Sequence, residues 1–318
     1  MSLIDRIFQE PELKAAPPVL VDVGAAGGVT PLWRSIARYS IGIGFEPDAR
    51  DAGKLSEANQ VFGRWIDCRS LLAPTVDQTG QKPFYLTHSP HCSSLLKPRN
   101  DRLGDWLFAD HFEVQKLTEV PAMTLPAALA ANGLARVDWL KCDTQGQDLG
   151  IFLSLPDAWR RRVLAVEFEP GLIDAYEGED KFWHTLQAMD SEPFWICNLE
   201  VCGTQRGNEE FFKRTLGPRT TRWIRKLAPA TPGWVNVRYL RSVTVDAETL
   251  DRRGLLLAWV FANLLRQHTH ALMVAEEGRN RFGGELFAAM AGRSGRRLRW
   301  AMIPRFPAWL WHRLGFGA

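Results

Sequence analysis

Apolar segments of the chain alternate between the pattern of buried strands and the pattern of helices. Residues 19–23 and 41–45 are almost entirely apolar over five positions, as in parallel strands that are covered on both faces. Five such strands are expected, at residues 19–23, 41–45, 61–67, 137–142 and 164–168. Helical patterns lie between or after them, at residues 31–39, 48–60, 124–133, 147–155 and 176–190. This alternation predicts a doubly wound, mostly parallel α/β sheet.

An insertion is expected between the third strand and the helix at 124–133. Residues 74–120 are rich in proline, and short β-prone pieces lie at 83–87 and 111–118. The segment therefore predicts an inserted hairpin and loop, which can shape a substrate pocket.

The sheet is expected to end before the C-terminal quarter of the chain. Further strands at 193–197 and 235–240 would bring the sheet to seven strands, and the pattern turns helical from residue 246 onward. We therefore expect an α/β domain over residues 1–245 and a helical C-terminal region over residues 246–318.

Composition and charge are those of a globular protein in a reducing compartment. Hydrophobic residues make up 46% and charged residues 24%, and the net charge of +3 is too small to indicate a nucleic-acid partner. The five cysteines form no Cys-x-x-Cys pair, which argues against a zinc site or a disulfide framework. The N-terminus resembles a short amphipathic helix and not a secretory signal, and the longest apolar stretch, 255–265, is shorter than the roughly 20 residues of a membrane span. A cytoplasmic location is expected.

The first strand ends in an acid and a glycine-rich turn, residues 22–28, and the second strand ends in Glu46. A carboxylate in this position, roughly 20 residues after the turn, can accept both ribose hydroxyls of a nucleoside. The glycine spacing is not that of a dinucleotide site, and Asp22 would repel a diphosphate but attract the ammonium group of S-adenosylmethionine. An ordinary strand-to-helix turn is the alternative to a cofactor site, and an NAD-dependent oxidoreductase is disfavoured.

Five blocks in the same order resemble the FkbM family of S-adenosylmethionine-dependent methyltransferases over residues 19–200. They are VDVGAAGG (21–28), GFEPD (44–48), SSLL (93–96), VPAMTL (120–125) and VDWLKCDTQGQDL (137–149). The resemblance implies the class I methyltransferase fold, which is Rossmann-like, and transfer of a methyl group to a hydroxyl of a sugar, glycolipid or other natural product. It assigns the cofactor to Asp22, Gly24, Ala25, Gly28, Glu46, Asp48, Ser70, Leu71 and Asp143.

Four residues are candidates for the chemistry of a hydroxyl acceptor. Asp143 follows the fourth strand and is expected to orient or deprotonate the acceptor, with a helix cap as the alternative. Of Glu167 and Glu169, at the end of the fifth strand, at most one is expected to face the site, and Glu167 is the candidate. His88 and His91, in the insertion, are candidate general bases. No metal is expected: a carboxylate pair at Asp143 could bind Mg²⁺, but His88-x-x-His91-Cys92 lacks a second pair of zinc ligands.

The C-terminal tail combines arginines with tryptophans and lacks acids. Residues 293–313 have the composition of a helix at a membrane interface, which would make the protein peripheral on the inner membrane face and a glycolipid acceptor plausible. In the alternative interpretation, the tryptophans pack on the catalytic domain. A scaffold that binds the cofactor without catalysis is a further alternative for the whole chain.

Overall fold

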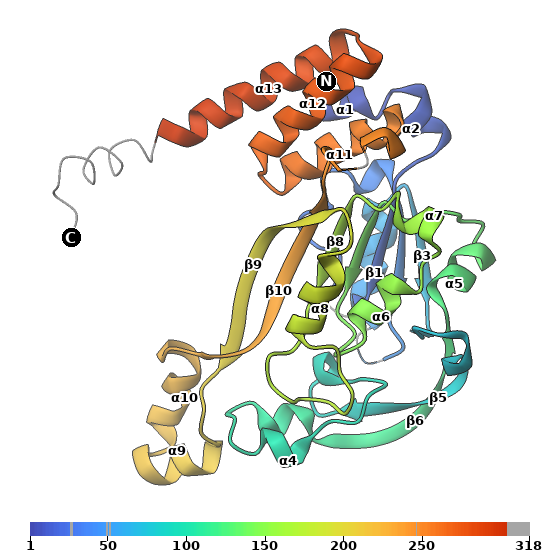
Figure 1. Cartoon of the computed structure of the whole chain (residues 1–318). Coiled ribbons are helices and arrows are strands. Elements are labelled where there is room, and N and C mark those ends of the chain that lie inside the picture. Colours follow the sequence, from blue (N-terminus) through green and yellow to red (C-terminus); the bar gives the residue numbers. More distant parts are fainter. Residues whose placement is uncertain (26–27, 49, 51, 246, 304–318) are drawn as a thin grey trace, which may run out of the picture. The chain divides into compact units, whose positions relative to one another are not determined.

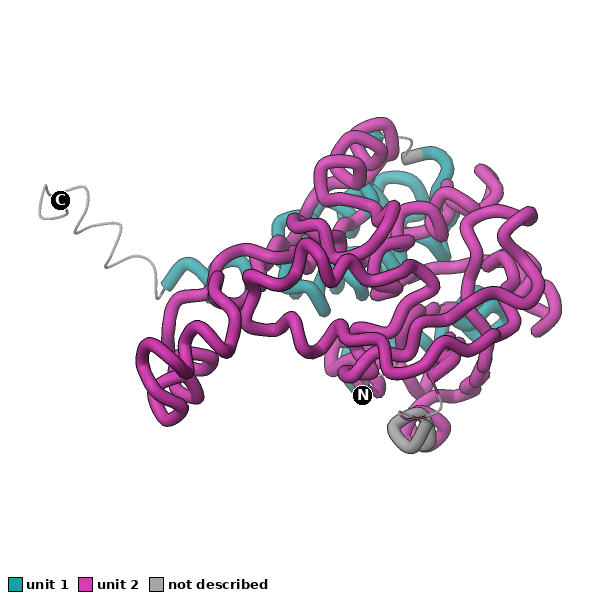
Figure 2. Tube along the Cα trace, turned by 90° about the horizontal axis from the view of Figure 1, so that it is seen from below, with its two compact units in different colours: residues 1–17, 241–318 teal, residues 18–240 magenta. Residues whose placement is uncertain are grey.

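The computed structural model describes residues 1–25, 28–48, 50, 52–245 and 247–303. It divides the chain into two compact units, residues 18–240 and residues 1–17 together with 241–318 (Figure 2). The sequence placed the N-terminal residues with the sheet and the boundary at 245/246. The structure instead groups the N-terminal residues with the C-terminal helices.

The larger unit contains a seven-stranded sheet with the strand order β3-β2-β1-β7-β8-β10-β9 (Figure 1). Its strands are β1 (Val19–Val23), β2 (Ile41–Phe45), β3 (Arg64–Cys68), β7 (Trp139–Cys142), β8 (Ala165–Phe168), β9 (Phe194–Thr204) and β10 (Thr231–Arg241). The first five of these pair in parallel, and β10 pairs with β8 antiparallel. The expected fold class, a mostly parallel α/β sheet with the Rossmann-like order of methyltransferases, is confirmed.

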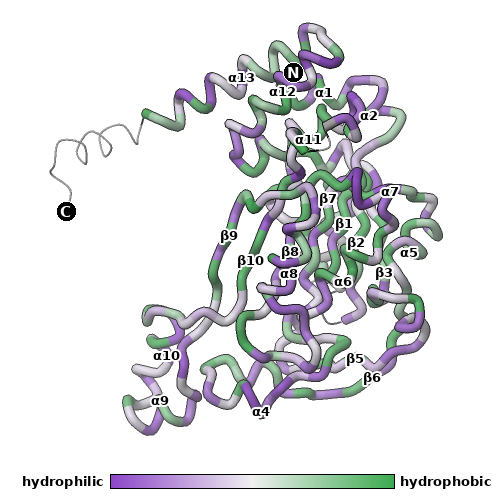
Figure 3. The backbone as a smooth tube through the Cα atoms, viewed as in Figure 1, coloured by the Kyte–Doolittle hydropathy of each residue, from purple (hydrophilic) through white to green (hydrophobic). Residues whose placement is uncertain are grey.

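The centre of the sheet is buried from solvent, which explains the apolar runs of the sequence. All residues of β1 and β8 are buried, and the tube of the central strands is largely in hydrophobic colours (Figure 3). The flanking helices are α3 (Ala52–Val61), α5 (Leu125–Ala131), α6 (Asp148–Leu153), α7 (Asp157–Arg160) and α8 (Phe182–Met189). The chain order reverses its direction across the sheet between β1 and β7, and in open α/β sheets such a switch point is where ligands bind.

The prediction of a helix at residues 31–39 is wrong. The segment forms turns that end in a 3₁₀ helix, Ala37–Tyr39, and Trp33, Ile36 and Tyr39 each bond to the carbonyl three residues earlier. The side chains of Trp33 and Ile36 are fully buried, and the Trp33 ring meets the Trp139 ring edge-on, 5.9 Å between centroids. Tertiary packing of these side chains thus outweighs the local helical pattern.

The insertion forms a small sheet of its own with the order β4-β6-β5. β5 (Gly80–Thr87) and β6 (Val114–Met123) pair antiparallel, as expected for a hairpin, and β4 (Leu71–Leu72) joins β6. Between β5 and β6, α4 (Asn100–Leu103) contributes a leucine, and the segment after it contributes aromatic side chains, to an apolar cluster separate from the core of the large sheet. Its buried members are Leu103, Trp106, Phe108, Phe112, Ala175 and Tyr176.

Two helices connect β9 to β10 and have no counterpart in the sequence-based prediction. They are α9 (Glu209–Leu216) and α10 (Pro218–Leu227). Both strands are longer than expected, so the hairpin carries the two helices away from the centre of the sheet (Figure 1).

The smaller unit is helical, as the pattern after residue 246 predicts. It contains α1 (Leu3–Ile7), α2 (Pro11–Ala15), α11 (Arg252–Leu264), α12 (His268–Phe282) and α13 (Glu285–Met302). Arg252 joins its two sequence segments through ion pairs with Glu10 and Glu12, at 2.5 and 2.6 Å. Trp259 of α11 donates to the buried hydroxyl of Ser294 in α13 at 2.9 Å. Within the described part of the chain, no helix is both long and apolar enough to span a membrane.

Candidate active site

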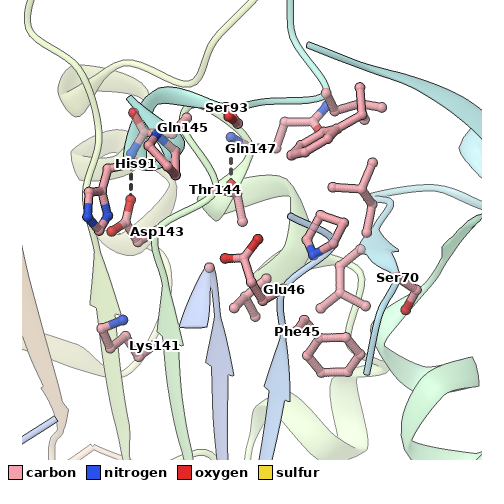
Figure 4. Close-up of a pocket in the computed structure, with 18 residues that line it drawn as sticks. Phe45, Glu46, Ser70, His91, Ser93, Lys141, Asp143, Thr144, Gln145 and Gln147 are labelled. Atoms are coloured by element: carbon pink, nitrogen blue, oxygen red, sulfur yellow. Dashed lines mark hydrogen bonds between the residues drawn. The ribbon is translucent and has the colours of Figure 1, made fainter. Parts of the chain in front are cut away.

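Two cavities lie at the carboxyl ends of the parallel strands. The smaller one, about 150 Å³, is bounded by the ends of β1, β2 and β7, by the segment after β3 and by the insertion (Figure 4). Five residues that the sequence assigned to the cofactor line it: Gly24, Glu46, Ser70, Leu71 and Asp143. The other four, Asp22, Ala25, Gly28 and Asp48, do not.

Gly24 brings the end of β1 against the end of β7. Its φ is +78°, and a Cβ at this position would lie 2.0 Å from the carbonyl oxygen of Asp143. Only glycine permits both the backbone conformation and this approach. Ala25 is buried beneath the turn, and Gly28 returns the chain with a φ of +76°. Ala25 and Gly28 therefore shape the backbone of the turn. Residues 26–27 of this turn lie outside the described range.

Glu46 and Ser70 are the buried polar residues that line the smaller cavity. Glu46 is buried, and its Oε1 accepts the backbone N–H of Asp48 at 2.8 Å, which holds the carboxylate at the end of β2. The buried Oγ of Ser70 has no hydrogen-bond partner among the described residues. Most buried polar groups in proteins have a hydrogen-bond partner, so Ser70 stays a predicted contact of a bound nucleoside.

Asp48 does not line this cavity but holds Arg50, which contacts the insertion that forms part of the cavity wall. Burial alone would raise the pKa of Asp48, but hydrogen bonds and the charge of Arg50 hold it below its usual value. The Arg50 guanidinium contacts Asp48 at 2.6 Å and also donates to the Thr87 carbonyl at 2.8 Å and to the Ser93 hydroxyl at 3.0 Å. Asp48 therefore connects the loop after β2 to the insertion.

Asp22 faces Lys141 and not the cavity. Its carboxylate lies 2.7 Å from the Lys141 ammonium, on the neighbouring strand. Burial raises the pKa of Asp22 despite that positive charge. Burial also disfavours the charged Lys141, but the charges of Asp22 and Asp143 outweigh it and raise the pKa of Lys141. Lys141 lines the cavity in front of Asp22, and a direct contact between Asp22 and a cofactor stays a prediction.

The larger cavity, about 540 Å³, falls within the roughly 300–1,000 Å³ of small-molecule sites. Four aromatic residues line it, Phe108 and Phe112 from the insertion, Tyr176 from the segment after β8 and Trp234 from β10. The two cavities share His91, Asp143 and Gln145. Figure 4 shows these three close together, on the side of the smaller cavity opposite Ser70.

A chain of hydrogen bonds orients Asp143 at this shared rim. Gln145 Nε2 donates to Asp143 Oδ1 at 2.6 Å, and the Tyr176 hydroxyl lies 3.1 Å from Gln145 Oε1 and 2.8 Å from the Cys92 carbonyl. Gln145 has a φ of +59°, an uncommon conformation for a residue with a side chain. The turn is therefore held by its surroundings, with the Asp143 carboxylate presented to both cavities.

Glu169 is the acid that joins Asp143 in the larger cavity. Burial, together with the charge of Asp143 and a hydrogen bond to it, raises the pKa of Glu169 to about 9. Asp148 holds the backbone at both places, because it accepts the N–H of Thr144, which follows Asp143, at 2.8 Å and that of Glu169 at 2.7 Å. Burial raises the pKa of Asp148 to about 6.

Glu167 was the candidate at the end of this strand, and the structure corrects that choice. It accepts hydrogen bonds from Trp139 Nε1 at 3.1 Å and from Arg238 Nε at 2.5 Å, and it lines neither cavity. These partners on β7 and β10 hold it inside the sheet. Glu169, two residues later, has left the strand and reaches the cavity.

The two candidate histidines differ in position. His91 is exposed and lines both cavities. His88 is also exposed but lines neither cavity, and its backbone N–H pairs with the Glu113 carbonyl at 2.8 Å along the hairpin. Among the described residues, no group of three His, Cys, Asp or Glu side chains is close enough to hold a metal ion.

Comparison with known proteins identifies the family of the chain. No curated protein matches the chain. The methyltransferase FkbM domain matches residues 22–201, more than half of the sequence, and this range includes the carboxyl end of β1, all of β7 and the pair Asp143–Glu169. The resemblance noted in the sequence is thus confirmed, and the chain belongs to the FkbM family of methyltransferases.

Proposed function

We propose that the protein is an S-adenosylmethionine-dependent O-methyltransferase that acts on a hydroxyl of a sugar, glycolipid or other natural product. One observation carries this proposal: a nucleoside-type cavity and a larger aromatic cavity meet at His91, Asp143 and Gln145. Methyl transfer requires a donor and an acceptor that approach from opposite sides of one reacting carbon, and the shared rim is a place for that carbon.

The smaller cavity suits the cofactor. Glu46 would accept the ribose hydroxyls, Ser70 and Leu71 would lie against the nucleoside, and Gly24 leaves room at the end of β1. When bound, S-adenosylmethionine supplies a methyl group on a positively charged sulfur. At about 150 Å³ the cavity is smaller than typical ligand sites, so its walls would have to separate on binding.

The larger cavity suits a polyhydroxylated acceptor. Aromatic rings can pack against the apolar faces of a sugar, while Asp143, Gln145 and Glu169 offer hydrogen bonds to hydroxyl groups. Asp143 would accept the proton of the reacting hydroxyl. Glu169 holds a proton at neutral pH and donates it in a hydrogen bond to Asp143, which limits the negative charge at the rim. Proximity and alignment of this kind can contribute about 7–11 kcal/mol to the barrier reduction.

Calorimetric titrations with S-adenosylmethionine, its demethylated product and NAD test the cofactor. Binding of the first two alone supports the proposal, whereas binding of NAD alone overturns it. A panel of sugar and glycolipid hydroxyls, assayed with labelled methyl donor, then tests transfer. The variant Asp143→Asn should keep cofactor binding and lose transfer; a cofactor-binding scaffold would show no transfer even before substitution.

Membrane contact through residues 293–313 remains part of this proposal. Four arginines lie on the last turns of α13, and Trp300 is exposed there. Residues 304–313 lie outside the described residues, so their role is untested.

A further inference from the structure

The helices between β9 and β10 form a defined structure at the end of a hairpin. Asn208 caps α9 by accepting the N–H of Phe211 at 2.7 Å. Gly217, with a φ of +81°, turns the chain directly into Pro218, the first residue of α10. The two helices stand beyond the sheet and alternate between hydrophilic and hydrophobic residues (Figures 1 and 3).

One stripe of α10 combines basic and large apolar side chains. Residues 219, 222, 223, 226 and 227 have the spacing i, i+3, i+4, i+7 and i+8, which places them on one side of a helix. Of these, Trp223 is 57% and Leu227 75% exposed, although both are large and apolar. The remaining three are Arg219, Arg222 and Lys226, all exposed. We call this set the α10 stripe.

The positive charge of the stripe is not neutralised within the described part of the chain. α10 contains no acidic residue, and the three cations of the stripe take part in none of the ion pairs found there. Arg225, on another side of the helix, does have partners: it contacts Glu209 at 2.6 Å and donates to the Leu107 carbonyl at 2.9 Å. Arg225 thus holds α10 against α9 and the insertion, while the side chains of the stripe remain exposed to solvent.

We propose that the α10 stripe binds a lipid surface that carries anionic headgroups. Trp and Leu side chains can enter the boundary between headgroups and acyl chains, while Arg and Lys contact the phosphates beside them. Lys226 already lies over the Trp223 ring, 5.9 Å from its centroid, so the cation and the apolar anchor act at one place. A nucleic acid would engage the cations but would leave Leu227 without an apolar environment.

Lipid binding at the stripe would also indicate the acceptor of the proposed methyl transfer. This second conclusion rests on the proposed function. β9 and β10 contribute Gly203, Thr204 and Trp234 to the larger cavity. Arg225 connects α10 to Leu107, which directly precedes the cavity residue Phe108. The same hairpin therefore forms part of the acceptor cavity and carries the stripe. The acceptor is then a hydroxylated headgroup of a membrane lipid.

Vesicle flotation of the full chain tests the stripe without cofactor or acceptor. The probes are phosphatidylcholine vesicles with and without phosphatidylglycerol. We expect binding to the anionic vesicles, and at least a tenfold loss of affinity in Arg219→Glu/Arg222→Glu/Lys226→Glu and in Trp223→Ala/Leu227→Ser. Matched controls are Lys116→Glu/Arg161→Glu/Arg162→Glu, with the same charge change at exposed positions, and Trp183→Ala, where the tryptophan is 53% exposed. Both controls should bind as the unsubstituted chain does, and circular dichroism checks that every variant is folded.

Three results overturn the proposal. The first is that the full chain does not float with anionic vesicles; the second is that both α10 variants float as well as the controls, which would assign binding to the C-terminal region. Stripe-dependent binding of single-stranded DNA without vesicle binding also overturns it and assigns the stripe to nucleic acid. Cofactor titration needs no vesicles, so failure at the stripe and failure of the proposed methyl transfer are distinguished.

Discussion

The side-chain carboxyl group of Glu169 is hydrogen-bonded to that of Asp143 in the larger cavity. Two buried carboxyl groups that are hydrogen-bonded to each other do not both ionise near neutral pH, because burial and mutual repulsion penalise the second charge. Burial and the charge of Asp143 accordingly raise the pKa of Glu169 to about 9. The pair holds one proton at neutral pH, and this proton is available to orient Asp143.

This pair predicts a fall in stability with rising pH. The unfolded chain releases the Glu169 proton near its ordinary pKa of 4.5, whereas the folded chain keeps it up to about 9, so rising pH favours unfolding between these values. Asp148 contributes in the same direction only up to about pH 6. Urea unfolding between about pH 6.5 and 8 should therefore show a decline that is smaller in Glu169→Gln, whose amide still donates to Asp143. An equal decline in both proteins would contradict the assignment.

Gly24 should be intolerant of any side chain. Gly24→Ala adds a Cβ that would lie 2.0 Å from the Asp143 carbonyl oxygen, in a residue with a φ of +78°. Gly133→Ala is a matched control, because its φ is +72° and nothing lies within 4 Å of its Cβ. Both variants pay about 1–2 kcal/mol for the left-handed backbone. Gly24→Ala should lose about 1–3 kcal/mol more in urea unfolding, and equal losses would show that the close approach is unimportant.

The central strands could be predicted from the sequence, because strands covered on both faces are apolar at nearly every position. The same reasoning fails for elements whose partners are distant. Trp33 is drawn into the core by Trp139, which replaces the expected helix with turns. α9 and α10 were not predicted, although their polar and apolar residues recur at helical spacing and Asn208 and Pro218 mark their starts. Most of their surface is exposed, so packing against the core did not single them out.

The site shows the same division. Glu46 and Asp143 each directly follow a parallel strand, and ligands bind at that edge of the sheet, so both were predictable. The choice between Glu167 and Glu169 was not. It depends on Trp139 and Arg238, which donate hydrogen bonds to Glu167. They lie on other strands, 28 and 71 residues away in the sequence. The place where β8 ends, at Phe168, is the only local signal that favours Glu169.

Tyr176 should affect transfer and not cofactor binding. Tyr176→Phe removes the hydroxyl that lies 3.1 Å from Gln145 Oε1, and Gln145 in turn orients Asp143. A lost hydrogen bond of about 1 kcal/mol corresponds to a fall of roughly fivefold to tenfold in kcat. Tyr239→Phe is the control, because the buried Tyr239 hydroxyl has no hydrogen-bond partner among the described residues. Calorimetry should give the same cofactor affinity for both variants; a weakened affinity in Tyr176→Phe would place this chain of hydrogen bonds on the cofactor side.

Lys141 is expected to stabilise the fold by neutralising Asp22. Lys141→Met would leave the buried Asp22 carboxylate without its partner at 2.7 Å, at a cost of about 3 kcal/mol in the free energy of unfolding. Asp22→Asn/Lys141→Met should recover most of that loss, because the remaining amide is neutral, and the two single variants complete a double-mutant cycle. If Lys141→Met is as stable as the unsubstituted protein, the pair is not structural. Calorimetry on the double variant then tests whether the pair also serves the cofactor: retained cofactor affinity means that Asp22 and Lys141 stabilise only the fold, and lost affinity means that the cofactor needs their charges.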